Sequence, residues 1–182
     1  MPNPSQTDPP TSLREGKYAR IERERRFLLA AAPAVTEALT VRRITDRYLT
    51  GTRLRLRLTQ YPGGDRDEHK FTQKVPAHRP GAVQGLITTT YLTRAEYQVL
   101  ATLPAVVLSK TRLSIPPLGI DIFDGPFSGL VLAEAEFTSD EAANAFVAPH
   151  CITEVTDDVR FTGGRLASTD RSELLSWLAE FG

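Results

Sequence analysis

The sequence contains little cysteine and carries no excess charge of either sign. Cys151 is the single cysteine among 182 residues, and 22 basic side chains balance 22 acidic ones. One cysteine excludes an internal disulfide and a cysteine-rich metal site. A net charge of zero provides no overall attraction to nucleic acid or to an anionic membrane, so any argument from charge has to be local.

Long apolar runs and targeting signals are also missing. No stretch approaches the roughly 20 apolar residues of a membrane-spanning helix. The first five residues form neither the basic region nor the apolar core of a signal peptide. We therefore expect a cytoplasmic protein without a membrane partner. Residues 1–17, rich in Pro, Ser, Asp and Thr, are predicted to be a flexible tail, and residues 18–182 a single domain.

The apolar pattern after the tail predicts mainly short strands. A turn rich in Gly and Pro at residues 61–65 joins two of them as a hairpin. The predicted strands cover residues 21–29, 44–50, 52–59, 69–75, 86–92, 105–115, 120–123 and 130–137.

Helix start signals are few and lie between or after the strands. A short helix or turn is expected at residues 33–39. Thr93 with Glu96, and Thr138 with Glu141, form capping boxes for two helices, the second of which should stop near Pro149. A last helix, capped by Asp170, should bury one apolar face formed by Leu174, Leu175, Leu178 and Phe181. The predicted class is therefore α+β, mainly β, with a few peripheral helices.

Charged residues on the predicted strands segregate by sign. Side chains two residues apart on a strand share a face. Three strands carry basic stripes, which consist of Arg53, Arg55 and Arg57, of Lys70 and Lys74, and of Lys110 and Arg112. Two strands carry acidic pairs, which are Glu22 with Glu24 and Glu134 with Glu136.

Each stripe alone is typical of the solvent-facing side of an ordinary antiparallel sheet. A solvated face usually mixes its signs, however, because like charges on one face repel. The whole set therefore favours strands that close around a shared polar space, where acids hold divalent cations and bases hold the oxygens of a polyanion. Unpaired charges cannot be buried dry, so this interior has to be hydrated or filled by a ligand.

Residues 22–26 read Glu-Arg-Glu-Arg-Arg and are the first of several short motifs along the chain. They resemble the ExExK signature of the CYTH domain, or triphosphate tunnel metalloenzyme, family. Residues 46–49 with the arginine strand at 52–59 resemble the family's "YL…RxR" stretch. Further resemblances are residues 71–74 to "LTxK", residues 110–112 to "KxR", residues 121–123, 129–130 and 133–136 to "DxF…GL…AExE", and residues 154–161 to "EVT…RY". Together they follow the family's order from residue 21 to 166.

The resemblance implies a closed, eight-stranded antiparallel barrel and a site inside it. The implied ligands of Mg²⁺ or Mn²⁺ are Glu22, Glu24, Asp121, Glu134 and Glu136. The implied phosphate-binding residues are Arg53, Arg55, Arg57, Lys70, Lys74, Lys110, Arg112 and Arg160. Arg53 could equally lie at the rim of the tunnel, and the alternative for Arg160 is a surface position near a turn. Glu24, Arg26 and Lys110 are the implied catalytic residues.

The implied function is metal-dependent hydrolysis of a linear triphosphate, with inorganic tripolyphosphate first among the substrates. Two departures from the family pattern leave alternatives open. Arg26 replaces the signature lysine and cannot act as a base, and the strand around Thr88–Thr90 is neutral where the family often has charges. The alternatives are a non-catalytic polyphosphate or nucleotide sensor, and a nucleoside or thiamine triphosphatase. Nucleic-acid binding is not expected, because acidic stripes are present and exposed aromatics are not interleaved with the arginines. A monomer and a homodimer both remain open.

Overall fold

The computed structural model describes residues 16–64, 66–77 and 79–182. The predicted tail at 1–17 therefore lies almost wholly outside the described residues. In the part of the chain that the structure describes, no helix has the length and apolarity needed to cross a membrane.

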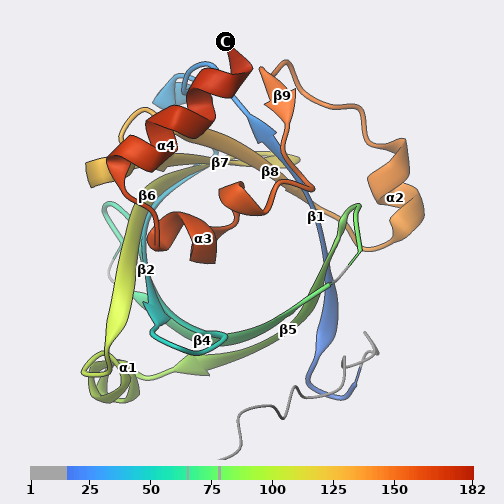
Figure 1. The fold of residues 1–182 in the computed structure, drawn as a ribbon. Coiled ribbons are helices and arrows are strands. Elements are labelled where there is room, and N and C mark those ends of the chain that lie inside the picture. Colours follow the sequence, from blue (N-terminus) through green and yellow to red (C-terminus); the bar gives the residue numbers. More distant parts are fainter. Residues whose placement is uncertain (1–15, 65, 78) are drawn as a thin grey trace, which may run out of the picture.

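Eight antiparallel strands close into a barrel, as the sequence predicted (Figure 1). The strands are β1 (Arg20–Leu28), β2 (Thr40–Leu49), β3 (Leu54–Gln60), β4 (Glu68–Pro76), β5 (Val83–Leu92), β6 (Ala105–Ile115), β7 (Leu118–Phe123) and β8 (Val131–Glu136). Their order is β5-β4-β3-β2-β6-β7-β8-β1, and pairing between β1 and β5 completes the ring. A short ninth strand, β9 (Thr153–Glu154), adds to β1.

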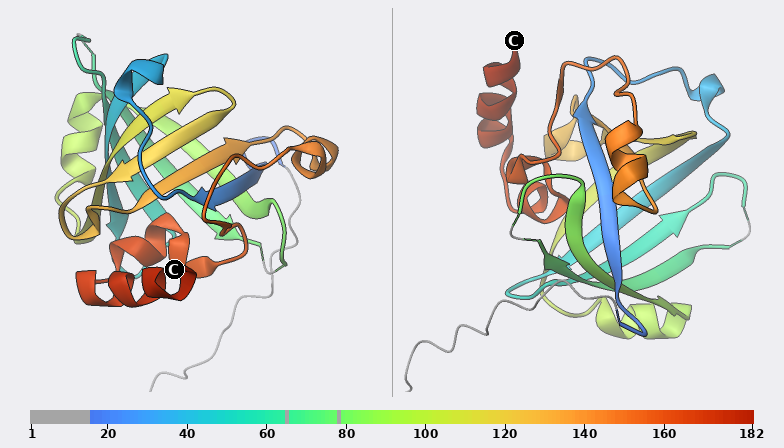
Figure 2. Two further views of the ribbon diagram at one scale, coloured as in Figure 1. Left: turned by 90° about the horizontal axis from the view of Figure 1, so that it is seen from above. Right: turned by 90° about the vertical axis from the view of Figure 1, so that its right-hand side faces the viewer.

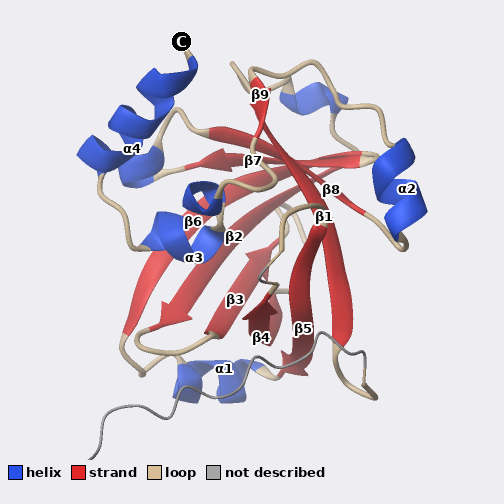
Figure 3. Ribbon diagram, turned by 45° about the vertical axis from the view of Figure 1, so that its right-hand side comes forward, coloured by secondary structure: helices blue, strands red, loops and turns tan. Residues whose placement is uncertain are grey.

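Helices surround the barrel and cover one of its ends (Figures 2 and 3). The α-helices are α1 (Arg94–Leu100), α2 (Asp140–Ala145), α3 (Gly163–Ala167) and α4 (Arg171–Leu178). The 3-10 turns are η1 (Val35–Glu37), η2 (Gly125–Phe127), η3 (Val159–Phe161) and η4 (Ala179–Phe181). α1 lies against β4 and β5, and α2 lies against β1.

Alternation along the strands separates an outer apolar layer from a mixed inner surface. On the outside, Phe27, Leu113 and Ile120 are buried in one cluster, against which Phe146 packs. Inward-facing residues near one end of the barrel form a second cluster with the C-terminal segment. Its members include Leu28, Leu108, Phe123 and Leu132 from the strands, and Phe161, Leu166, Leu174 and Trp177 from η3, α3 and α4. This apolar plug anchors the C-terminal helices at that end.

Most predicted helix signals are confirmed. Thr93 and Glu96 form the capping box of α1, and the Asp170 side chain accepts from the backbone N–H of Glu173 at the start of α4. The cap of α2 was predicted one residue too early. The residue at the cap is Ser139 and not Thr138, and the Ser139 side chain accepts a hydrogen bond from the backbone N–H of Ala142. α2 also ends at Ala145, well before Pro149.

The C-terminal segment differs from the prediction in two ways. Leu175 is 49% exposed, and Trp177 lies in the buried face instead. η3 and α3 were not predicted, because the Gly-Gly pair at their junction is a poor helix former. Gly163 is required there by close packing: a Cβ at this position would lie 2.0 Å from the hydroxyl of Tyr48.

Candidate functional site

The predicted charge stripes face the inside of the barrel. Backbone register places them on neighbouring strands: Arg57 lies between Asp46 and Lys70, and Arg112 lies opposite Asp121. On β1, Glu24 lies opposite Glu136. Strands far apart in sequence thus bring acids and bases together in one interior.

The arginines of β3 meet a carboxylate on β2. The Nε and Nη2 atoms of Arg57 donate to Asp46 at 2.6 and 2.7 Å, and the Nε atom of Arg55 lies 3.5 Å from the same carboxylate. Asp46 is 1% exposed. Burial alone would raise the pKa of the Asp46 carboxyl, but the charges of Arg57 and Arg55 hold it well below its usual range. Asp46 is therefore ionised and neutralises part of the arginine pair.

The cations of β6 meet a carboxylate on β7. Asp121 is fully buried. Its carboxylate accepts a hydrogen bond from Nζ of Lys110 and two from Arg112, whose Nε and Nη2 atoms each lie 2.6 Å from a carboxylate oxygen. Arg112 also donates to Glu134 on β8. Burial would raise the pKa of Glu134, yet the charges of Arg112 and Lys110 lower it well below its usual range. Lys110 and Arg112 are thus held inside the barrel with their charges partly balanced.

The four predicted metal-binding glutamates lie on the adjacent strands β1 and β8. Glu24 is buried, Glu136 is exposed, and Glu22 pairs with Nζ of Lys74 at 2.7 Å. Burial, together with the nearby charge of Glu134, raises the pKa of Glu24 to about 8. This corner of the barrel therefore places carboxyl groups so close together, and so far from water, that one of them, Glu24, favours its protonated form.

Arg26 sits beside these glutamates and is anchored to the loop that follows β9. Its Nη2 atom donates to the backbone oxygen of Thr156 and to Oε1 of Gln84, both at 2.9 Å. Its Nη1 atom lies 3.6 Å from Glu24. The Nε atom is buried without a hydrogen-bond partner, which is costly unless a ligand supplies an acceptor.

The wall formed by β4 and β5 is basic on one strand and neutral on the other. Lys70 pairs with Glu68 at 2.8 Å and lies over the ring of Tyr91. The inner face of β5 includes Thr89, whose hydroxyl is 3.1 Å from that of Thr72 on β4. The predicted neutral strand is therefore part of the inner surface.

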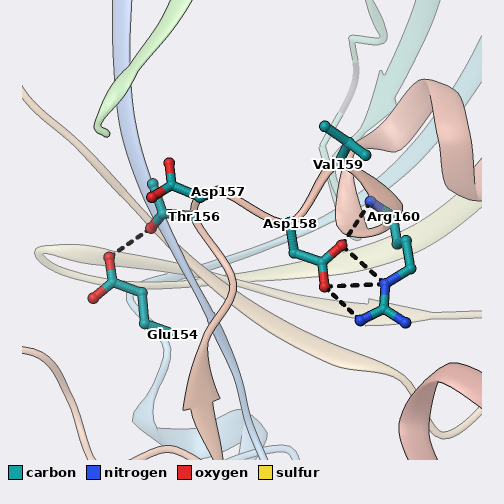
Figure 4. Close-up of a pocket in the computed structure, with 6 residues that line it drawn as sticks. All are labelled: Glu154, Thr156, Asp157, Asp158, Val159 and Arg160. Carbon is teal, nitrogen blue, oxygen red and sulfur yellow. Dashed lines mark hydrogen bonds and ion pairs between the residues drawn. The ribbon is translucent and has the colours of Figure 1, made fainter. Parts of the chain in front are cut away.

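Two predicted phosphate-binding residues lie apart from the stripes. Arg53 is exposed in the bend before β3, which agrees with the rim position. Arg160 lies in η3, where it pairs with Asp158 at 2.8 Å and with Glu180 at 2.7 Å. Figure 4 shows Arg160 turned toward Asp158, and both residues line a pocket formed by β9, the loop after it and η3. Its bonds join the loop after β9 to the C-terminal helices.

Sequence reasoning missed Asp46, Arg42, Gln84 and Thr156. Asp46 and Arg42 are four residues apart on β2 and pair with the inward-facing Arg57 and Arg112, so alternation within residues 40–49 could have found them. Gln84 and Thr156 act through Arg26. Thr156 lies in the motif at residues 154–161 and Gln84 lies in no motif, but both contacts with Arg26 join distant segments, so no local signal indicated them.

Comparisons with known proteins support this architecture. No protein-family model and no curated protein matches the sequence. A solved structure of the hypothetical protein NE1496 is 30% identical, matches 82% of this chain and 99% of its own, and has a TM-score of 0.54. The chain belongs to the CYTH, or triphosphate tunnel, family. A second structure of NE1496, described as an inorganic triphosphatase, is 28% identical over 81% of this chain and 95% of its own, with a TM-score of 0.53.

The glutamates that the CYTH resemblance assigns to metal have suitable chemistry. Carboxylate oxygens are the donors that Mg²⁺ and Mn²⁺ prefer. Among the described residues, no three acidic, His or Cys side chains form a ready-made metal site. Glu22 is instead paired with Lys74, and Glu134 with Arg112. The donor set fits a divalent cation if these two glutamates exchange a basic partner for the ion.

Asp121 differs from the other acids that the CYTH resemblance assigns to metal. Lys110 and Arg112 occupy both of its oxygens, and its side chain is fully buried. This environment favours a role as counter-ion to the phosphate-binding cations over a role as metal ligand.

Proposed function

We propose that the barrel binds a linear triphosphate together with Mg²⁺ or Mn²⁺ and hydrolyses it, with inorganic tripolyphosphate as the first substrate. The convergence of basic side chains from three strands on a glutamate-rich wall carries the proposal. The similarity to NE1496, described as an inorganic triphosphatase, supports the same substrate class.

The basic residues bind and orient the phosphate chain. Arginine can bind phosphate oxygens through two parallel N–H bonds, and lysine binds them as a point charge. The proposed set is Arg55, Arg57, Lys70, Lys74, Lys110 and Arg112. The orphaned buried Nε atom of Arg26 would gain an acceptor when a phosphate oxygen lies next to it.

Glu22, Glu24, Glu134 and Glu136 would hold the divalent cation. When bound, the cation neutralises phosphate oxygens and makes a coordinated water more acidic. The raised pKa of Glu24 makes its ionised carboxylate more basic than that of an ordinary glutamate, so in this ionised form Glu24 can accept the proton that the attacking water loses. Water attacks the terminal phosphorus, the bond to the bridging oxygen breaks, and orthophosphate and pyrophosphate leave. Lys110 and Arg26 stabilise the charge that develops on the bridging oxygen.

A phosphate-release assay tests this function. Purified protein should release orthophosphate from tripolyphosphate in the presence of Mg²⁺ or Mn²⁺, and faster than from ATP or thiamine triphosphate. Faster release from ATP or thiamine triphosphate would make the protein a nucleoside or thiamine triphosphatase. Chelation of the metal should stop the reaction.

One observation favours a second candidate, a polyphosphate sensor. Arg26 stays charged and is already bonded to Thr156 and Gln84, so it cannot activate water as a base. A sensor would show a raised melting temperature with tripolyphosphate and metal, but no phosphate release over hours.

A further inference from the structure

Asp46 lies at the centre of the basic wall. Both of its oxygens accept from Arg57, at 2.6 and 2.7 Å, and Arg55 is 3.5 Å away. Burial raises the pKa of this carboxyl, and the charges of Arg57 and Arg55 lower it by more. The charge of Lys110 on β6 lowers it further. Asp46 thus faces cations from both neighbouring strands.

The three strands of this wall, β2, β3 and β6, are described in full, and Asp46 is their only carboxylate. The cations on their inner faces are Arg42, Arg55, Arg57, Lys110 and Arg112. Cations removed from water need a counter-charge or a ligand. Before a polyanion binds, Asp46 supplies this counter-charge for the β3 arginines, as Asp121 does for Lys110 and Arg112.

The contact also controls how the arginine can meet a phosphate. Asp46 occupies Nε and Nη2 of Arg57, one of the two forked edges of the guanidinium. It fixes the plane of the group and leaves the other edge for the ligand.

We propose that Asp46 is a positioning residue of the polyphosphate site. It aligns Arg57 and Arg55, and its negative charge lowers their affinity for the bound substrate. This inference rests on the proposed triphosphate hydrolysis.

The test is the steady-state kinetics of Asp46→Asn with tripolyphosphate. Loss of a unit negative charge beside the phosphate site should lower KM by about tenfold. Loss of alignment of Arg57 should lower kcat by about tenfold. A merely structural role would reduce the active fraction, so that kcat falls while KM stays the same, and that result would overturn the proposal.

Asp124→Asn is the matched control. Asp124 pairs with the outward-facing Arg43 at 2.6 Å, so the same chemical change occurs outside the barrel. Its KM and kcat should equal those of the wild type. If Asp46→Asn does not fold, Asp46→Glu keeps the charge but shifts the carboxylate. It should keep KM within about threefold of the wild-type value and lower kcat, and an unchanged kcat would overturn the alignment role.

Calorimetric titration with tripolyphosphate separates this inference from the proposed function. A wild-type protein that binds but releases no phosphate would overturn hydrolysis alone. Equal affinities of wild type and Asp46→Asn would overturn the role of Asp46, whether or not the protein is an enzyme.

Discussion

Gly163 at the start of α3 lies directly against the phenol of Tyr48 on the inner face of β2. A Cβ at Gly163 would be 2.0 Å from the Tyr48 hydroxyl and 3.1 Å from its ring carbon Cζ. Tyr48 also packs against the apolar plug that contains Leu166 and Trp177. The short helix α3 can therefore seat on the barrel only because residue 163 has no side chain.

Gly163→Ala should lower the free energy of unfolding by about 1–3 kcal/mol, the usual cost of overpacking. Gly164→Ala is the matched control, because a Cβ there would meet Tyr48 at an ordinary 3.7 Å. Urea unfolding of both variants checks the prediction. Equal stability of the two would mean that α3 does not depend on this contact.

Glu136→Gln should abolish metal-dependent turnover and leave the fold intact, because the side chain is exposed and forms part of the proposed metal-binding set. Mn²⁺ titration by calorimetry should show weakened binding, while the circular dichroism spectrum and the melting temperature stay unchanged. Glu180→Gln, outside the barrel beside Arg160, serves as the control and should bind Mn²⁺ normally. Normal Mn²⁺ binding by Glu136→Gln would remove Glu136 from the metal site.

Arg57→Ala should weaken tripolyphosphate binding by about 1.5–3 kcal/mol, the worth of a hydrogen bond to a charged group. Arg43→Ala, on the outer face of β2, removes the same side chain away from the interior and should leave affinity unchanged. Calorimetric titration compares the two variants. If they bind tripolyphosphate equally, the ligand does not contact β3.

Arg26→Lys should hold or raise the rate of phosphate release, because it restores the family signature. The lysine side chain is shorter than that of arginine and reaches Gln84 and Thr156 less well, so the loop after β9 should also become less stable. Rate measurements and hydrogen exchange of residues 154–158 check the two effects. A protein that binds tripolyphosphate but releases no phosphate, as wild type and as variant, with Mg²⁺, Mn²⁺ or Co²⁺, would be a sensor.

Asp46 should make the fold sensitive to acid. Its pKa is lowered on folding, so its contribution to stability is present above the unfolded-state pKa of about 3.9 and is lost as pH falls below it. Between pH 5 and 3, the wild-type free energy of unfolding should fall more steeply than that of Asp46→Asn, by up to about 1.4 kcal/mol per pH unit. Urea unfolding at several pH values measures the slopes, with Asp124→Asn as control. Parallel slopes for wild type and Asp46→Asn would contradict the lowered pKa.

Local patterns in the sequence determined which side chains share a face. Because strand side chains alternate, the members of each stripe, such as Lys110 with Arg112, could be assigned to one face of their strand without coordinates. The segregation of charge by sign then favoured a shared polar interior. The strand at residues 105–115 was predicted with its observed bounds. Helix starts at Thr93 and Asp170 were also readable, since a cap bonds to a backbone N–H only three residues away.

Only the tertiary structure decided which stripes are neighbours and how their charges pair. The adjacency of β2 with β6 and of β1 with β5 joins segments far apart in the chain, and no local signal encodes it. That adjacency brings Asp46 between the cations of β3 and β6, and it surrounds Asp121 with Lys110 and Arg112. The placement of Arg160 beside Glu180 depends on the packing of α4 and η4. Alternation specifies the face of the strand to which each side chain points. Which charged side chains meet across strands depends on the long-range register, which is set when the barrel closes.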